Sequence, residues 1–403
     1  MRALTFTAVV TTVALLVCAP SRASAQAATS DYPVITDRHF ALDAYQGSTV
    51  ASYRIVGMGG TSLATAEGAA SMSSNPASVA SRLATWNDWF EWDFSADTYQ
   101  PDLASDFDNN GVTQDSSANT LAGNGAIMMY LGEWGTGLSV ISEERRIELD
   151  TGDPAKLTAE LVRLSLGRSV RARSLTFGVS LAAGNFTIAH TDANGNPGSA
   201  LVDVSSTSLD AGFLWRPPAR DLRVGARASL PLTASLDSLA CDPMNCGGYI
   251  LPERVEFPWS LGAGVAWRRG PSRWNTVVHD DWRDEKSLIL AADLLVTGGV
   301  REGAGIEAFL DHRYQQSGRH ALVSLRAGAE YEWVPGWLRV RGGSYWEPGR
   351  FEGVSGRAHA TAGLDVRVWS FCFWGDRYRL RLSFATDVAP RYTNVIFSLG
   401  FWH

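Results

Sequence analysis

The chain has 403 residues, of which 45% are hydrophobic, 10% aromatic and only 19% charged. This composition is too apolar for a disordered chain and less charged than that of most soluble enzymes. The formal net charge of −7 argues against nucleic acid as a partner, because phosphate binding needs a concentrated basic face.

Residues 1–25 are typical of a cleaved secretory leader (signal peptide). Arg2 supplies a positive start, residues 8–19 are almost continuously apolar, and Ala23-Ser24-Ala25 is a small-residue cleavage signal. The apolar stretch is shorter than the about 20 residues that a transmembrane helix needs. The sequence therefore predicts an exported protein whose mature chain begins at Gln26.

Residues 26–83 are expected to form an N-terminal extension followed by a compact segment. Small residues dominate between Tyr53 and Ala77, so the backbone there can pack closely. Asn75-Pro76 is a turn signal near the end of this stretch. Taken alone, these features predict a tightly packed segment that precedes the first strand.

Residues 84–403 show the period of two that is typical of β-strands. Apolar residues alternate with polar or very small ones, as in Leu175–Leu181, Leu222–Ala228, Leu261–Trp267, Ala360–Val368 and Tyr378–Phe384. No run after the leader approaches the about 18 consecutive apolar residues of a membrane helix. We count about fourteen alternating segments, which predicts an all-β fold.

Three features indicate that the apolar strand faces contact lipid and the polar faces line a lumen. Aromatic residues lie at strand ends, as expected for girdles at both membrane interfaces: Trp134, Trp215, Trp267, Tyr331, Trp333, Trp337 and Trp346. Short turns such as Pro335-Gly336 alternate with long polar connections such as Asp97 to Asn124. The chain also ends on an alternating strand, Thr393–Phe401. Because a strand edge cannot stay open in lipid, we predict a transmembrane antiparallel β-barrel of about 14 strands.

The compact segment and three later strands carry motifs of a known family. The glycine-rich Gly57-Met58-Gly59-Gly60 is followed by Asn75-Pro76-Ala77, and residues 258–267, 326–331 and 338–348 are further motif segments. Together they resemble the start and the later strands of the FadL family of outer-membrane fatty-acid and hydrocarbon transporters. The resemblance covers most of residues 53–403 and implies a 14-stranded barrel with an N-terminal hatch in its lumen.

The resemblance also implies a function. Such barrels take up hydrophobic small molecules such as long-chain fatty acids passively across the bacterial outer membrane, and release them sideways into its lipid. The hatch or gate residues would be Gly57, Gly59, Gly60, Asn75, Pro76 and Ala77. Release of an apolar solute into water is unfavourable, so sideways release into lipid is physically reasonable. The ligand-binding residues do not align with the family, and residues 31–40 have no counterpart in it.

PorV-like barrels begin with the same motifs and are the alternative. They serve protein secretion or surface attachment, and a shared fold does not separate the two functions, because function depends on the site. Uptake predicts a hydrophobic ligand and outer-membrane lipid as partners, whereas the alternative predicts secreted or surface proteins. The sequence does not determine the oligomeric state.

Two loop motifs are candidates for a metal site and a disulfide. Asp106, Asp108 and Asn110 match the first half of a calcium-binding loop, but Ser117 stands where its bidentate Glu is expected. We therefore expect a solvated extracellular loop there, with bound calcium as the alternative. Cys241 and Cys246 flank a tight turn in an exported protein, where oxidation is the default, so we expect a disulfide.

The remaining polar residues form no pattern typical of an enzyme or of a cofactor site. The seven histidines are scattered, and the sequence has neither an H-E-x-x-H zinc motif nor a G-x-S-x-G nucleophile elbow. Cys372 is expected to be buried as a small apolar residue. Arginines on the polar strand faces are expected mainly to pair with acidic residues, and alternatively to guide an anionic head group. They are Arg223, Arg227, Arg268, Arg339, Arg341, Arg367, Arg379 and Arg381.

Overall fold

The computed structural model describes most of the chain after the predicted leader. The described residues are 32–45, 47–83, 88–101, 106–111, 120–147, 154–191, 197–236, 241–276, 282–373 and 376–402. The predicted leader, residues 1–25, lies outside them.

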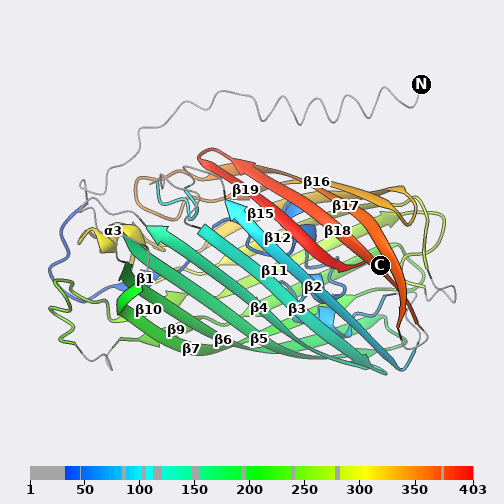
Figure 1. Ribbon diagram of the computed structural model, residues 1–403, viewed down its shortest axis with the longest axis horizontal. Coiled ribbons are helices and arrows are strands. Elements are labelled where there is room, and N and C mark those ends of the chain that lie inside the picture. Colours follow the sequence, from blue (N-terminus) through cyan, green and yellow to red (C-terminus); the bar gives the residue numbers. More distant parts are fainter. Residues whose placement is uncertain are drawn as a thin grey trace.

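Fourteen antiparallel strands form a closed barrel (Figure 1). They are β2 (Phe90–Pro101), β3 (Thr120–Leu131), β4 (Trp134–Ile147), β5 (Ala155–Val170), β6 (Leu175–Thr191), β7 (Pro197–Trp215), β8 (Leu222–Ser229), β11 (Ser260–Arg269), β12 (Leu288–Thr297), β15 (Leu322–Val334), β16 (Leu338–Glu347), β17 (Arg357–Phe373), β18 (Asp376–Ala389) and β19 (Tyr392–Phe401). The last strand pairs with the first, from Asn394 opposite Pro101 to Gly400 opposite Ser95. The predicted all-β barrel of about 14 strands is confirmed.

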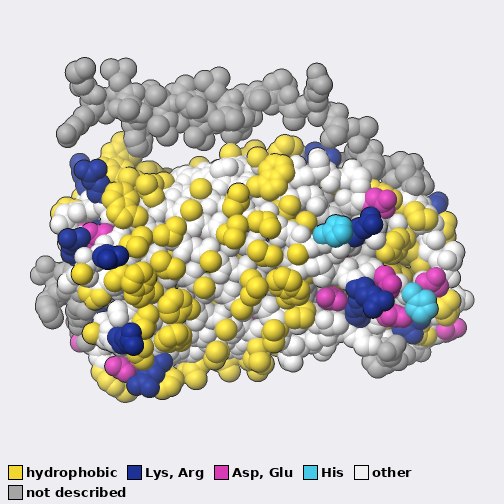
Figure 2. Space-filling view, turned by 180° about the vertical axis from the view of Figure 1, so that it is seen from behind, with side chains coloured by type: hydrophobic (Ala, Val, Ile, Leu, Met, Phe, Trp, Pro, Cys, Tyr) yellow, Lys and Arg dark blue, Asp and Glu magenta, His cyan; other side chains and the backbone are white. Residues whose placement is uncertain are grey.

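Strand alternation places apolar side chains on the outer surface of the barrel. In β6, Phe177, Val179 and Leu181 point outward and are about half exposed, while Thr176 and Ser180 are buried in the lumen. Figure 2 shows the outward apolar side chains as a belt between two ends that carry charged residues. An apolar surface of this extent is unfavourable in water and is what hydrocarbon requires.

The two ends of the barrel differ in their connections. At one end the turns are short, such as Pro335-Gly336 between β15 and β16, except for residues 270–287. The other end carries the long segments between β8 and β11 and between β12 and β15. We call these the short-turn end and the long-connection end. The connection predicted from Asp97 to Asn124 is shorter than expected, because β2 and β3 continue through these polar residues.

The aromatic residues predicted to form two girdles form one. Six of them lie at the short-turn end, namely Trp134, Trp215, Trp267, Tyr331, Trp333 and Trp337. Trp346, at the end of β16, is the member of this set at the long-connection end.

A second sheet and a short helix cover the long-connection end, at the left of Figure 1. The sheet has the order β14-β13-β1-β10-β9. Its strands are β1 (Ala41–Asp43), β9 (Leu232–Ser235), β10 (Arg254–Phe257), β13 (Gly303–Ala304) and β14 (Gln316–Ser317), and the helix is α3 (Ile306–Leu310). The N-terminal extension supplies the central strand β1, so it is an integral part of this end.

The segment between the extension and β2 fills the lumen. It contains α2 (Tyr53–Gly57) and the 3-10 turns η2 (Ala69–Ser71) and η3 (Pro76–Ala80). α2 packs on β16, β17 and β18, and η3 packs on β5, β6 and β7. We call residues 53–83 the hatch.

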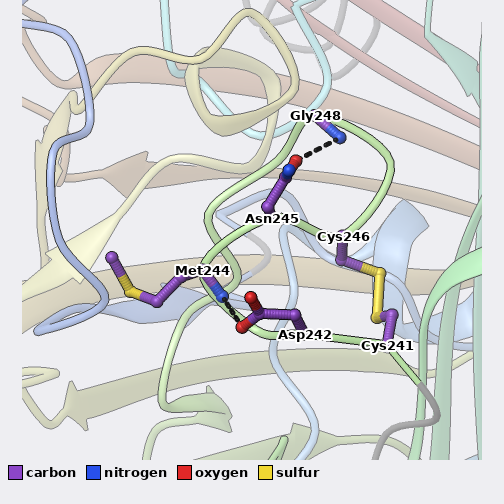
Figure 3. The surroundings of a disulfide bond; sticks show 6 residues. All are labelled: Cys241, Asp242, Met244, Asn245, Cys246 and Gly248. Carbon is purple, nitrogen blue, oxygen red and sulfur yellow. Dashed lines mark hydrogen bonds between the residues drawn. A yellow bond between two sulfur atoms is a disulfide. The ribbon is translucent and has the colours of Figure 1, made fainter.

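The cysteines show one expected and one unexpected arrangement. Cys241 and Cys246 form the expected disulfide within the segment that connects β9 to β10. In the same turn, Asp242 and Asn245 accept hydrogen bonds from Met244 N and Gly248 N at 3.0 and 3.2 Å (Figure 3). Cys372 is exposed, contrary to the expectation, because the pairing of β17 with β16 ends at Val366 and β17 continues beyond it to Phe373. No helix in the described ranges is long and apolar enough to span a membrane.

Candidate functional site

Asn75 forms hydrogen bonds both within the hatch and to the barrel wall. As the N-cap of η3, it accepts a hydrogen bond from Ala77 N through Oδ1 at 3.0 Å. Its Nδ2 donates to Leu63 O at 2.9 Å and to Phe213 O in β7 at 3.4 Å. Pro76 follows at the first position of the turn, where its missing N–H costs nothing. Because Asn75 is fully buried, loss of these bonds would leave polar groups without water.

Wall glycines allow the backbone of η3 to touch the strands. A Cβ at Gly178 in β6 would overlap Pro76 O, and one at Gly212 in β7 would overlap Asn75 Oδ1. The same close approach of hatch backbone to wall occurs at Gly135, Gly225, Gly328 and Gly343. These glycines were not among the predicted site residues, although their position on the polar faces of the strands was a visible signal.

The other predicted gate residues make a second contact with the wall. Gly59 and Gly60 have φ angles of +63° and +75°, which favour glycine. Gly59 N donates to Thr361 Oγ1 in β17 at 2.9 Å. A Cβ at Gly57 would lie 3.2 Å from the Cα of Gly363 in the same strand. The six predicted gate residues therefore form two separate contact points, one on β15, β16 and β17 and one on β6 and β7.

Wall carboxylates hold the hatch by its backbone amides. Asp293 in β12 accepts from Ser62 N at 2.7 Å and Leu63 N at 3.0 Å, and Asp93 in β2 accepts from Ala69 N at 2.7 Å. The position of the hatch in the structure is thus held by hydrogen bonds to wall side chains as well as by packing.

Most arginines of the polar strand faces pair with acidic residues. Arg341 lies 2.6 Å from both Glu330 and Asp365. Further pairs are Arg223 with Glu67, Arg227 with Asp210, Arg268 with Glu285, Arg339 with Glu332 and Arg379 with Asp284. Arg367 stacks over Trp337. Arg381 instead binds neutral groups, with Phe401 O at 2.8 Å and Ser383 Oγ at 2.8 Å.

Inside the long-connection end the lumen is apolar. In β6 the apolar face changes sides, so that Phe186 and Ile188 point inward while Asn185 and Thr187 point outward. Leu157 in β5 and Val202 in β7 join the same buried cluster. The extension and α3 complete it through Phe40, Leu42, Phe309 and Leu310. A water-filled pore has a polar interior, so this end is not built like one.

Residues 106–111 of the predicted calcium loop are buried in this end, so the expectation of a solvated loop is wrong for them, and Ser117 lies outside the described residues. Asn110 N donates to Asp106 at 3.0 Å and to Asp108 at 3.3 Å. Arg391 and Arg145 lie 3.3 and 3.7 Å from these carboxylates and supply the positive charge that a cation would bring. Within the described ranges, no group of three or more His, Cys, Asp or Glu is placed to hold a metal ion.

Burial and neighbouring negative charge raise the pKa values of two carboxyl groups in and beside this loop. Burial, with the neighbouring Asp108, raises the pKa of Asp106 to about 7. The same two causes raise the pKa of Glu307 in α3 to about 8. Glu307 also accepts a hydrogen bond from the Asn110 amide, which joins the loop to α3.

Solved structures share this fold. They include a FadL homologue from Pseudomonas aeruginosa, with a TM-score of 0.54 and 12% identity over 90% of this chain and 99% of that chain. The CymD monoaromatic hydrocarbon channel has a TM-score of 0.51 and 12% identity over 87% and 96% of the two chains. The Pseudomonas putida toluene transporter TodX has a TM-score of 0.51 and 15% identity over 91% and 99%. No protein-family model matches the sequence, and no curated protein matches it.

The fold and the lumen together define a closed β-barrel with an apolar outer belt and a hatch inside. More particularly, the chain has the FadL-type fold, as its motifs predicted.

Proposed function

We propose that this protein is a channel of the bacterial outer membrane for passive uptake of hydrophobic small molecules, gated by residues 53–83. The observation that carries the proposal is the apolar interior of the long-connection end. An apolar solute gains about 25 cal/mol for each Å² of its surface that leaves water for such an interior. The fold shared with a hydrocarbon channel and a toluene transporter supports the proposal. Long-chain fatty acids and monoaromatic hydrocarbons are the two candidate ligand classes.

The gate is the contact of the hatch with the wall at Asn75-Pro76-Ala77 and Gly57–Gly60. Passage requires that the hatch shift from these contacts, and it needs neither ATP nor covalent chemistry. On the short-turn side of the hatch the lumen is charged, as the cluster of Arg341, Glu330 and Asp365 shows. Since an apolar molecule gains nothing there, sideways release into lipid fits the arrangement. Export through the cleaved leader 1–25 belongs to the same proposal.

The test is uptake of a labelled long-chain fatty acid and of labelled toluene by cells that lack their own transporter. Wild type is compared with an Asn75→Ala, Pro76→Ala variant at equal abundance, with the fold of both barrels checked by heat modifiability on gels. We expect the wild type to restore uptake of at least one ligand and the variant to change its rate. If neither ligand is taken up and the barrel instead co-purifies with a secreted or surface protein, the PorV-like function replaces this one.

A further inference from the structure

A polar cavity lies at the short-turn end, between the hatch and the described residues 270–276 and 282–287, apart from the apolar interior. Its volume is about 120 Å³, which exceeds what a single water molecule needs. In the part of the chain that the structure describes, seven arginines and five acidic residues line it, and no lysine does. We call it the arginine chamber. The residues that matter below are Arg223, Trp274, Trp282, Arg283 and Arg381.

The carboxylates around the arginine chamber are already engaged. Glu67 lies 2.8 Å from Arg223 and 3.5 Å from Arg216. Glu330 binds Arg54 and Arg341, Glu332 binds Arg339, Asp284 binds Arg379, and Asp93 accepts a hatch amide. Arg381 is 4% exposed and makes no ion pair within the described ranges. Carboxylates outside the lining neutralise Arg341 and Arg268, so the described lining arginines without a close acidic partner are Arg381 and Arg283, whose Nε lies 4.0 Å from Glu285.

Three N–H donors of the lining also have no hydrogen-bond partner among the described residues. They are Arg223 Nη1, Trp282 Nε1 and Arg283 Nε. Arg223 is only 1% exposed. Arg283 Nε lies 4.0 Å from Glu285, which is too far for a hydrogen bond, although its other nitrogens bind Trp274 O and Thr276 O at 2.9 and 3.0 Å. Buried donors of native proteins are nearly always paired, so these point to a missing acceptor.

Two indole rings give the arginine chamber flat apolar walls. Trp274 is 4% exposed, and the Arg223 guanidinium lies 3.7 Å from its ring centroid. The ring of Trp282 is covered on one side by Arg379 at 4.1 Å. A ligand for this space therefore needs an acceptor group with negative charge and a compact apolar body.

We propose that the arginine chamber binds a small organic carboxylate. Its carboxylate accepts from Arg223, Arg283 and Trp282, with Arg381 supplying further positive charge, and its apolar body lies against Trp274 and Trp282. Guanidinium groups suit this acceptor, because their planar N–H groups bind both oxygens of a carboxylate. The inference goes beyond uptake of hydrophobic molecules. It concerns binding at the other side of the hatch and holds whether or not such molecules pass.

The test is isothermal titration of the full-length purified barrel in detergent at low salt. The probes are benzoate, its uncharged isostere benzamide, and inorganic phosphate. Arg283→Gln removes one charge, and Trp282→Phe removes the indole N–H and narrows the aromatic wall to a single ring. Arg168→Gln is the matched control, because Arg168 lies at the same end but pairs with Glu133 at the surface. Heat modifiability shows that each variant is folded.

We expect saturable binding of benzoate and none of benzamide. Arg283→Gln should weaken benzoate at least tenfold and Trp282→Phe severalfold, while Arg168→Gln leaves it unchanged. Absence of benzoate binding, or equal affinity in all three variants, would overturn the proposal. Phosphate binding as tight as that of benzoate would overturn its organic part, since the indole walls would then contribute nothing.

Discussion

Replacing a wall glycine by alanine should loosen the hatch without opening the barrel. A Cβ at Gly212 would overlap Asn75 Oδ1 and lie 2.7 Å from Ala77 N, so the N-cap of η3 must move. Movement breaks the three hydrogen bonds of Asn75, which contribute about 1 kcal/mol each. A loss of about 3 kcal/mol raises the population of the displaced hatch roughly a hundredfold.

Hydrogen exchange measured by mass spectrometry reports this population directly. Peptides from residues 68–83 should exchange about a hundredfold faster in Gly212→Ala, and similarly in Gly178→Ala, than in wild type. Peptides from β5 and β6 away from the hatch should keep their protection. Gly125→Ala is the matched control, because a Cβ at Gly125 meets nothing within 4 Å.

The outcome that would refute this reasoning is specific. If the hatch peptides of Gly178→Ala and Gly212→Ala exchange at the wild-type rate while both barrels are folded, close approach of backbone to wall does not hold the hatch. Equal acceleration in Gly125→Ala would show that any strand substitution suffices, and the contacts of η3 would lose their special role.

Three further predictions concern the loop, the disulfide and the wall carboxylate. The raised pKa values of Asp106 and Glu307 mean that the folded protein binds protons more tightly than the unfolded chain, so this stabilisation is complete below about pH 4 and is lost as pH rises through 7 to 8. The thermal unfolding midpoint of the wild type should therefore fall between about pH 4 and pH 8, and it should fall less in Glu307→Gln. An equal slope in both proteins would contradict the raised pKa of Glu307. Replacing Cys241 and Cys246 by serine should destabilise their segment by about 2 kcal/mol, seen as faster exchange of residues 241–251 with the hatch unaffected; acceleration of the hatch as well would contradict its independence. Asp293→Asn removes the charge that two hatch amides share and should speed exchange around residues 62–63 about tenfold, whereas unchanged exchange would show that packing alone holds them.

Local sequence patterns were sufficient to predict the strands and the direction of their two faces. The alternation of Phe177, Val179 and Leu181 with small or polar residues fixes both the extended backbone and its two faces. The same patterning, repeated to the end of the chain, requires closure, because an open edge is not tolerated in lipid. The motifs around Gly57–Gly60 and Asn75–Ala77 likewise marked the segment that fills the lumen.

The burial of loops and strand ends depends on contacts with residues far away in the sequence. Asp106 and Asp108 look like exposed ligands in the sequence, yet Arg145 and Arg391, far away in the chain, neutralise them inside the barrel. Cys372 looks buried between two phenylalanines, yet the hairpin of β17 and β18 extends past its neighbour. Both errors have one cause, since burial of a loop or strand end depends on where distant strands stop.

Period-two alternation is a local property, so the chain alone predicts the strands, their approximate number and the side of each strand that meets lipid in the middle of the barrel. The folded barrel alone shows where the apolar face of β6 changes sides, which strand glycines contact the hatch, and which buried arginine nitrogens have no hydrogen-bond partner among the described residues. Those properties depend on register and closure, which bring Arg223, Trp282 and Arg381 to one cavity although long stretches of sequence separate them.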